Sequence, residues 1–191
     1  DMREAGAMVH VTFGINIVVD TSSRHSGLFC GEFDKAWQAS CSYVQKGYGL
    51  PIDYQADVVI ASCGGFPKDL NFYQSTKTLF NASRAVKEGG TLIMLAECPE
   101  GSGSKDFFDW IKLLSKGCLD EALRASFTIG GYIFYAACES IRRSKTLLLS
   151  SMEPELVRDM GVRSFKDMKD LLAEVDFNGK DVYVIPYGGS V

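Results

Sequence analysis

The sequence predicts an α/β fold with a mainly parallel, Rossmann-like layered sheet and flanking helices, preceded by an N-terminal hairpin and helix segment. Residues 57–63 (DVVIASC) and 91–96 (TLIMLA) are short, apolar runs, as is typical of strands covered on both faces. The stretch 70–87 between them has helical length and period, and Gly89 and Gly90 follow it. The three segments form a βαβ unit, whose crossover should be right-handed.

Further helices and short apolar strands alternate after residue 96, which indicates a mainly parallel sheet. The expected elements are helices over 105–115, 121–127 and 132–143, a strand over 146–149, helices over 154–160 and 165–175, and a last strand over 181–185.

The first part of the chain follows a different pattern, because its apolar residues alternate singly between 11 and 20. A polar turn over 21–27 should join this strand to a short return strand. The elements expected here are the end of a helix over 2–8, strands over 11–20 and 28–30, and a helix over 32–46 with Phe33, Trp37, Cys41 and Val44 on one face. We expect two parts, residues 1–49 and residues 50–191.

Composition narrows the function classes. The chain has 191 residues, of which 46% are hydrophobic, and this suits a globular protein of one domain, or one and a half. Its net charge is −4, and we expect no nucleic-acid partner, which would need a clustered basic face. No apolar stretch is long enough to span a membrane and no secretory signal begins the chain, so we expect a cytoplasmic protein. The six cysteines are expected to be buried free thiols. A zinc site is not expected, because His10 and His25 are the only imidazoles.

Ligands of open α/β sheets bind beyond the carboxyl ends of the strands, which directs attention to two loops. In the first, Gly64 and Gly65 would let the backbone turn sharply and approach a ligand, and Asp69 is a plausible helix N-cap. A tight turn without any ligand explains the same residues. No GxGxxG fingerprint is present.

The second loop begins at Glu97, which could be a general base or could cap a nearby helix. Its GSGS sequence at 101–104 could hold an anion on free backbone N–H groups or could simply start a helix. Farther along, Gly130 and Gly131 precede Tyr132, which could lie near the cleft or be a buried residue at a helix start.

The helix over 70–87 carries a polar stripe without any carboxylate. Helical spacing places Asn71, Gln74, Lys77 or Thr78, and Asn81 along it. Lys77 has no anionic partner three or four residues away. An unpaired ammonium beside an amide suits the carboxylate and hydroxyl of a small molecule, although an ordinary solvated face is also compatible. Spacing leaves Tyr73 either in the core or on the floor of a ligand site.

The stretch 56–101, ADVVIASCGGFPKDLNFYQSTKTLFNASRAVKEGGTLIMLAECPEG, closely resembles the C-terminal domain of the nickel-pincer-nucleotide-dependent lactate racemase family. The matching motifs are GGFPKD, NFYQSTK, AVKEGGT and AECPEG. Weaker similarity runs through MEPELVRDMG and PYGGS, and upstream through REAGAMVHVTFGINIVVD. The resemblance implies that residues 1–49 are the trailing part of the family's N-terminal domain and its crossover, and that residues 50–191 are the C-terminal α/β substrate-binding domain.

The resemblance implies a two-domain 2-hydroxyacid racemase or epimerase with its active site between the halves. Hydride would leave the substrate's hydroxyl-bearing carbon and return on the opposite face, with a nickel-pincer nucleotide as cofactor. Gln74 and Lys77 match the family's substrate-binding glutamine and lysine, and Tyr73 matches the tyrosine before them. The possible cleft-lining residues are Gly64, Gly65, Glu97 and Tyr132.

The departures from the family concern its N-terminal domain, which supplies the cofactor-linking lysine, the nickel-ligand histidine and the acid/base histidines. No such motif is present, and His10 and His25 do not match them. The resemblance therefore implies a C-terminal half that is inactive alone and contributes no catalytic or metal-binding residue. Tyr132–Ile133 stand where many relatives carry a polar or basic pair, which leaves the substrate open.

Two other functions stay open. One is a non-catalytic α/β subunit that docks onto a cofactor-bearing partner. The other is a Rossmann-like nucleotide-binding enzyme, such as a methyltransferase or dehydrogenase, although its glycine fingerprint is lacking.

Overall fold

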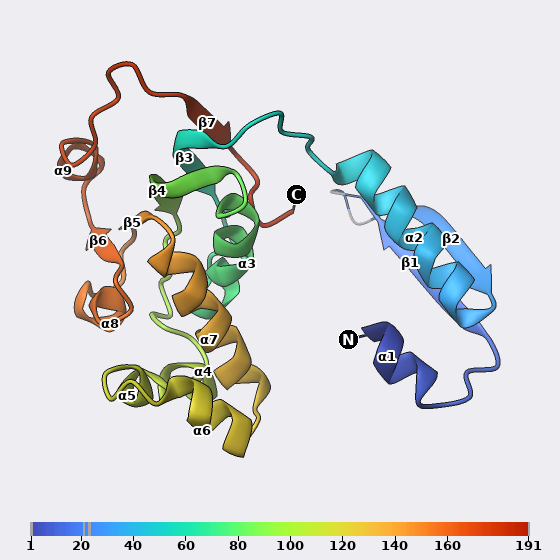
Figure 1. Cartoon of the computed structure of the whole chain (residues 1–191). Coiled ribbons are helices and arrows are strands. Elements are labelled where there is room, and N and C mark those ends of the chain that lie inside the picture. The colour runs from blue at the N-terminus through green and yellow to red at the C-terminus, as the bar shows by residue number, and fades with distance from the viewer. Residues whose placement is uncertain (1, 21, 23, 191) are drawn as a thin grey trace. The chain divides into compact units, whose positions relative to one another are not determined.

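The computed structural model describes residues 2–20, 22 and 24–190 (Figure 1). The chain divides into a first unit, which consists of residues within 1–51 together with Ser190, and a second unit over Ile52–Gly189. Thr21 and Ser23 of the predicted turn lie outside the described residues, as do Asp1 and Val191. The fold class predicted from the sequence is confirmed, because a parallel sheet with flanking helices is accompanied by an N-terminal hairpin and helices.

The first unit is a two-stranded antiparallel sheet covered by a helix. Its elements are α1 (Met2–Ala7), β1 (Gly14–Val19), β2 (His25–Gly31) and α2 (Phe33–Tyr48). Glu32 caps α2, because its carboxylate accepts the backbone N–H groups of Asp34 and Lys35 at 3.1 and 3.2 Å. The residues of α2 that are buried are Ala36 and Ser40, whereas Cys41 and Val44 of the expected apolar face are exposed.

The second unit is built on a five-stranded sheet in the order β6-β5-β4-β3-β7, in which every pair is parallel. The strands are β3 (Ala56–Ser62), β4 (Val86–Leu95), β5 (Lys145–Leu149), β6 (Arg163–Phe165) and β7 (Val182–Ile185). The helices are α3 (Phe72–Ala82), α4 (Lys105–Phe108), α5 (Ile111–Leu114), α6 (Leu119–Ala125), α7 (Ile129–Arg142), α8 (Glu155–Arg158) and α9 (Met168–Leu172).

Both faces of this sheet are covered. Alternate residues of β4 point to opposite sides, so Leu92 and Met94 join the large core with residues of α3 and α7, whereas Ile93 packs with Leu171 of α9. Burial on both faces explains why the strands read as continuous apolar runs.

The expected helix over 70–87 is too long at its C-terminal end. It ends at Ala82, and β4 already begins at Val86, which pairs with Ala56. Gly89 and Gly90 lie inside β4 beside a register shift; Gly89 has φ +72°, and a Cβ on Gly90 would stand 2.8 Å from the Asp57 carbonyl oxygen. The glycine pair therefore allows a close approach of two strands and does not end the helix.

Two later predictions also need correction. The helix expected over 105–115 is two short helices, α4 and α5, and the one expected over 165–175 begins only at Met168. Phe165 instead belongs to β6 and pairs with Leu149. A strand of three residues is too short to show a period, so only its partner strand reveals it. No helix of the described residues is long and apolar enough to cross a membrane.

Candidate functional site

The carboxyl ends of β3, β4 and β5 surround an open hollow with a cavity volume of ≈ 670 Å³. Gly65 and Glu97, from the loops that follow β3 and β4, line this hollow, and their role in a substrate cleft stays a prediction. Ser150, Ser151 and Lys166 complete its wall from the loops after β5 and β6. Sequence reasoning missed all three residues: Lys166 because β6 was not recognised, and Ser150 and Ser151 because the position of the predicted strand over 146–149 in the sheet could not be read from the sequence.

A second hollow lies at the ends of β3 and β7, and Gly64 and Tyr187 line it. Gly64 and Gly65 have φ of +86° and +78°, which favours glycine. A Cβ on Gly64 would also stand 3.0 Å from Cδ1 of Tyr187. Backbone conformation and packing account for both glycines, and their contact with a ligand stays a prediction.

Asp69 is not the N-cap of the following helix. That cap is Asn71, whose Oδ1 accepts the backbone N–H of Gln74 at 3.0 Å. The buried Asp69 carboxylate instead accepts the Glu97 N–H at 3.3 Å, and its carbonyl accepts the Cys98 N–H at 2.9 Å. Asp69 therefore joins the two loops that follow β3 and β4.

Glu97 is exposed, and its backbone carbonyl group is held by hydrogen bonds. This oxygen accepts the hydroxyls of Ser150 and Ser151, each at 2.8 Å. The N-cap of the next helix, α4, is Ser104. Because α4 has only 4 residues, the GSGS turn begins a short helix and we assign no anion site to it.

Gln74 and Lys77 are brought together on α3. The Lys77 ammonium donates to Oε1 of Gln74 at 2.9 Å; Gln74 is half-buried and Lys77 is exposed. Across the described part of the chain, no carboxylate forms an ion pair with Lys77. The pair does not belong to the lining of either hollow at the end of the sheet.

The rest of the predicted stripe serves the fold. Asn71 caps α3, Thr78 is buried, and the Asn81 amide donates to the Gly188 carbonyl at 2.8 Å. The polar face of α3 that stays available to a small molecule is therefore shorter than the spacing suggested and centres on Gln74 and Lys77.

The two tyrosines differ in position. Tyr73 packs edge-on against Phe107, with ring centroids 5.4 Å apart, and so lies against the core. Tyr132, at the start of α7, is 48% exposed, and its ring lies 6.2 Å from that of Phe127, so a buried tyrosine at this helix start is wrong. The preceding Gly130 and Gly131 are buried under Asp106 and Trp110.

Comparison with known proteins identifies the family. Residues 52–191 match the family model described as the lactate racemase C-terminal domain. The chain belongs to the lactate racemase family.

Two curated lactate racemases are among its relatives. The chain is 31% identical to that of Thermoanaerobacterium thermosaccharolyticum, with all of the chain covering 47% of that protein. It is 34% identical to that of Lactiplantibacillus plantarum, with 56% of the chain covering 25% of the protein. The chain thus spans at most about half the length of the curated lactate racemases it matches.

Two solved structures share the fold of this chain, and one of them is a lactate racemase. The lactate racemase apoprotein from T. thermosaccharolyticum matches with a TM-score of 0.83 and 29% identity, over 100% of this chain and 48% of that one. A protein from Thermotoga maritima shares the fold, with a TM-score of 0.62 at 15% identity over 92% of this chain and 47% of that one.

The residues of this lactate racemase-family chain do not fit a nickel site. No three His, Cys, Asp or Glu side chains of the described residues gather where they could hold a metal ion. His10 and His25 are both exposed in the first unit. We therefore assign no described side chain to nickel.

The cysteines of this family member are all free, as expected, but not all are buried. Cys63, Cys98 and Cys138 are buried, whereas Cys30 and Cys41 are exposed. Burial raises the pKa of the Cys138 thiol to about 12, which makes its reactive thiolate scarce at neutral pH.

Proposed function

We propose that this chain is the substrate-binding C-terminal half of a lactate racemase-like 2-hydroxyacid racemase or epimerase. The observation that carries the proposal is the contact between Gln74 and Lys77, in which an amide and an ammonium without a carboxylate partner among the described residues share one exposed stretch of α3. Both belong to the motif NFYQSTK by which the sequence resembles the family.

The pair has the capacity to hold a 2-hydroxyacid. An ammonium has three donors, and one of those of Lys77 is used by Gln74 at 2.9 Å. The others can bind a substrate carboxylate with charge-assisted hydrogen bonds. The Gln74 amide group adds two N–H donors for the carboxylate or the hydroxyl. Holding the acid group at two points would orient the hydroxyl-bearing carbon for reaction.

Local packing supports a fixed position for this pair. The Asn71 cap orders the first turn of α3, and Tyr73 anchors that turn against Phe107. Gln74 and Lys77 therefore stand on a helix whose opposite side is buried, which limits the motion of both groups.

The redox chemistry belongs to the other half of the full-length protein. A nickel-pincer nucleotide held there would supply the hydride chemistry at the hydroxyl-bearing carbon of the substrate. The chain described here supplies substrate binding and is inactive alone. Gly64, Gly65, Glu97 and Tyr132 are proposed to line the cleft that the two halves form.

All six cysteines are free, which is typical of a reducing compartment and supports a cytoplasmic location as part of the proposal.

The test uses the full-length protein loaded with its nickel cofactor and a panel of 2-hydroxyacids, including lactate, malate and sugar acids. Lys77→Ala and Gln74→Ala should each lower turnover strongly, by about 100-fold for Lys77→Ala, because a charge-assisted contact is lost. Nickel content should not change. Lys116→Ala is the matched control, because it removes an exposed lysine of the same unit.

Normal turnover by both variants would show that the pair is an ordinary solvated surface. Absence of racemisation on every acid of the panel would favour a non-catalytic binding subunit.

A further inference from the structure

The hollow at the carboxyl ends of β3, β4 and β5 contains two carboxylates that lack a cationic partner. Asp69 lines the hollow and is 8% exposed, and Glu97 lines it from the next loop. Across the described part of the chain, no ammonium or guanidinium forms an ion pair with either side chain. A buried carboxylate is stable only when hydrogen-bond donors surround it.

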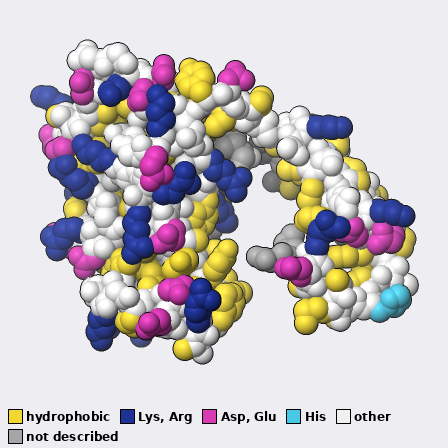
Figure 2. All heavy atoms as spheres, viewed as in Figure 1, with side chains coloured by type: hydrophobic (Ala, Val, Ile, Leu, Met, Phe, Trp, Pro, Cys, Tyr) yellow, Lys and Arg dark blue, Asp and Glu magenta, His cyan; other side chains and the backbone are white. Residues whose placement is uncertain are grey.

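Other charged side chains of the second unit have partners of opposite sign. Figure 2 shows Lys and Arg side chains interspersed with Asp and Glu side chains over this unit. Arg163, for example, donates to both oxygens of Glu174 at 2.6 and 2.8 Å, and the Lys87 ammonium lies 2.9 Å from Asp57. The carboxylates of the hollow depart from this pattern.

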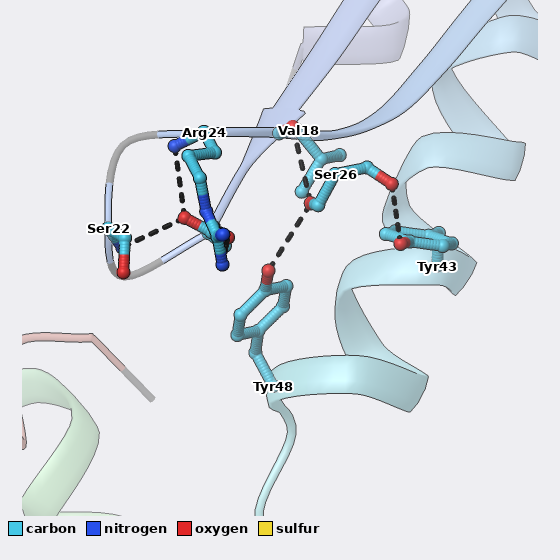
Figure 3. A network of polar contacts seen from close by, with 7 residues as sticks. Val18, Ser22, Arg24, Ser26, Tyr43 and Tyr48 are labelled. Carbon is cyan, nitrogen blue, oxygen red and sulfur yellow. Dashed lines mark hydrogen bonds and ion pairs between the residues drawn. The ribbon is translucent and has the colours of Figure 1, made fainter.

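The loop of the hairpin shows how a satisfied carboxylate of this chain is held (Figure 3). Asp20 accepts the backbone N–H groups of Ser22 and Arg24 at 2.8 and 3.0 Å, and also the Arg24 guanidinium at 3.1 Å. Asp69, in contrast, accepts one hydrogen bond from the described residues, that of the Glu97 N–H to its Oδ2 at 3.3 Å. The Asp69 carboxylate therefore has room for further donors.

The serine hydroxyls of the hollow also present acceptors. Ser150 and Ser151 both donate their hydroxyl protons to the Glu97 carbonyl, each at 2.8 Å, which leaves oxygen lone pairs. Ser150 Oγ is buried and accepts the Met152 N–H at 3.1 Å. Ser151 is exposed, and no described group donates to its hydroxyl oxygen. A ligand of this hollow must therefore bring hydrogen-bond donors.

The remaining lining favours a neutral molecule. Lys166 places a positive charge at the hollow, although its ammonium lies 2.8 Å from Oε1 of Glu153. Charges of both signs therefore surround the hollow, and among the described residues no His, Cys, Asp and Glu side chains gather in a group of three that could hold a metal ion. The half-buried side chains of Leu95 and Leu149 add an apolar surface to the lining.

The neighbouring start of α3 is closed to a phosphate group. The N–H groups of Phe72 and Tyr73 donate to carbonyls of the loop that follows β4, at 2.9 and 3.2 Å, and that of Gln74 donates to the Asn71 cap at 3.0 Å. Anions bind helix starts through N–H groups without such partners. A ligand of the hollow therefore finds hydroxyl acceptors but no phosphate-binding turn.

We propose that this hollow binds a phosphate-free sugar ring, whose hydroxyl groups donate to the carboxylates of Asp69 and Glu97. We name it the sugar site. The C–H face of the ring lies against Leu95 and Leu149. Glu97 follows β4, the second strand of the βαβ unit, and in dinucleotide-binding sheets an acidic side chain of this unit accepts a ribose hydroxyl. A free sugar and the ribose of a nucleoside offer the same chemistry.

The inference goes beyond the proposed function, because Gln74 and Lys77 do not line the sugar site. Gly65 and Glu97 are also proposed to line the cleft between the halves, but sugar binding is measured without turnover. If adenosine binds and Lys77→Ala has normal turnover, only the proposed function is wrong. If Lys77→Ala lowers turnover and no sugar binds, only the sugar site is wrong.

The test measures binding to the full-length protein by saturation-transfer difference NMR and titration calorimetry. The probes are adenosine, methyl β-ribofuranoside and 2′,3′-dideoxyadenosine. Adenosine should bind with a Kd of about 1 mM or below, and the dideoxy compound at least about tenfold more weakly, because it lacks both hydroxyl donors. Tighter binding of adenosine than of the methyl riboside would assign the site to a nucleoside, and equal binding would assign it to a free sugar.

Two isosteric variants test the carboxylates. Glu97→Gln and Asp69→Asn should each weaken adenosine binding about tenfold, because a hydrogen bond to a charged group is lost. Glu97 is exposed, so Glu97→Gln keeps the test decisive even if the buried Asp69→Asn protein does not fold. Glu121→Gln is the matched control, because it neutralises an exposed carboxylate of α6, and it should bind as the wild type does.

Three results would overturn the sugar site. One is equal binding of adenosine and its dideoxy analogue, and another is wild-type affinity of Glu97→Gln. The third is binding of the diamine putrescine in the absence of any binding by the two sugar probes, which would show that the carboxylates attract an amine.

Discussion

Gly131→Ala tests how closely α7 packs against Trp110, which lies between α4 and α5. A methyl group at this position would overlap Cε2 and Cζ2 of Trp110 and come within 2.9 Å of its Nε1. The indole is one rigid plane, so these atoms cannot move independently. Either the whole ring or the start of α7 must shift.

The magnitude follows from two opposing contributions to the free energy of unfolding. Alanine stabilises a helix interior by about 1 kcal/mol relative to glycine. Overfilling a packed site costs about 1–3 kcal/mol, and contact with three atoms of a rigid ring places this case at the upper end. We expect a net loss of about 2 kcal/mol, or roughly 8 °C in Tm for a unit of this size.

Thermal unfolding followed by circular dichroism measures the effect. Gly47→Ala on α2 is the contrasting control, because nothing lies within 4 Å of its added methyl group, and it should stabilise the first unit by up to about 1 kcal/mol. A Gly131→Ala protein as stable as the wild type would refute the packing argument. The same variant, if folded, should also displace Tyr132 from its neighbour Phe127.

Three further predictions concern other parts of the second unit and its thiols. The Asp181 backbone N–H and the Lys87 ammonium hold the pKa of Asp57 below its usual value. The folding stability that these contacts add is therefore present above about pH 3.9 and is lost as the pH falls below it. Asp57→Asn should therefore lose less unfolding free energy than the wild type between neutral pH and pH 3 in urea titrations. Asn71→Ala should cost about 1 kcal/mol of stability through loss of the α3 cap. In the folded protein at pH 8, Ellman's reagent should modify the exposed Cys41 quickly and the buried Cys138 only after unfolding.

Each of these has a contradicting outcome. An equal pH dependence for Asp57→Asn and wild type would mean that the contacts of Asp57 add nothing to stability. Unchanged stability of Asn71→Ala would mean that its side chain does not cap α3. Rapid modification of Cys138 in the native protein would contradict its burial.

The sequence alone determined the fold class and the family. Apolar runs at β3 and β4 are visible in one dimension because strands covered on both faces carry few polar residues. The contact between Gln74 and Lys77 was also predictable, because residues three apart on a helix are neighbours whatever surrounds them.

Only the tertiary structure decided the features that depend on distant segments. Val86 pairs with Ala56 and so belongs to the sheet, which is why α3 is shorter than predicted. The three-residue strand β6 is defined by its pairing with β5. The wall formed by Ser150, Ser151 and Lys166 exists because parallel strands end at one edge of the sheet. The spacing of apolar residues depends on neighbours within one or two helical turns along the sequence. Strand partners and buried faces, in contrast, are set by residues far away in the chain. For the same reason, the exposed apolar side of the β1–β2 sheet is recognisable only once α2 is seen to cover the other side.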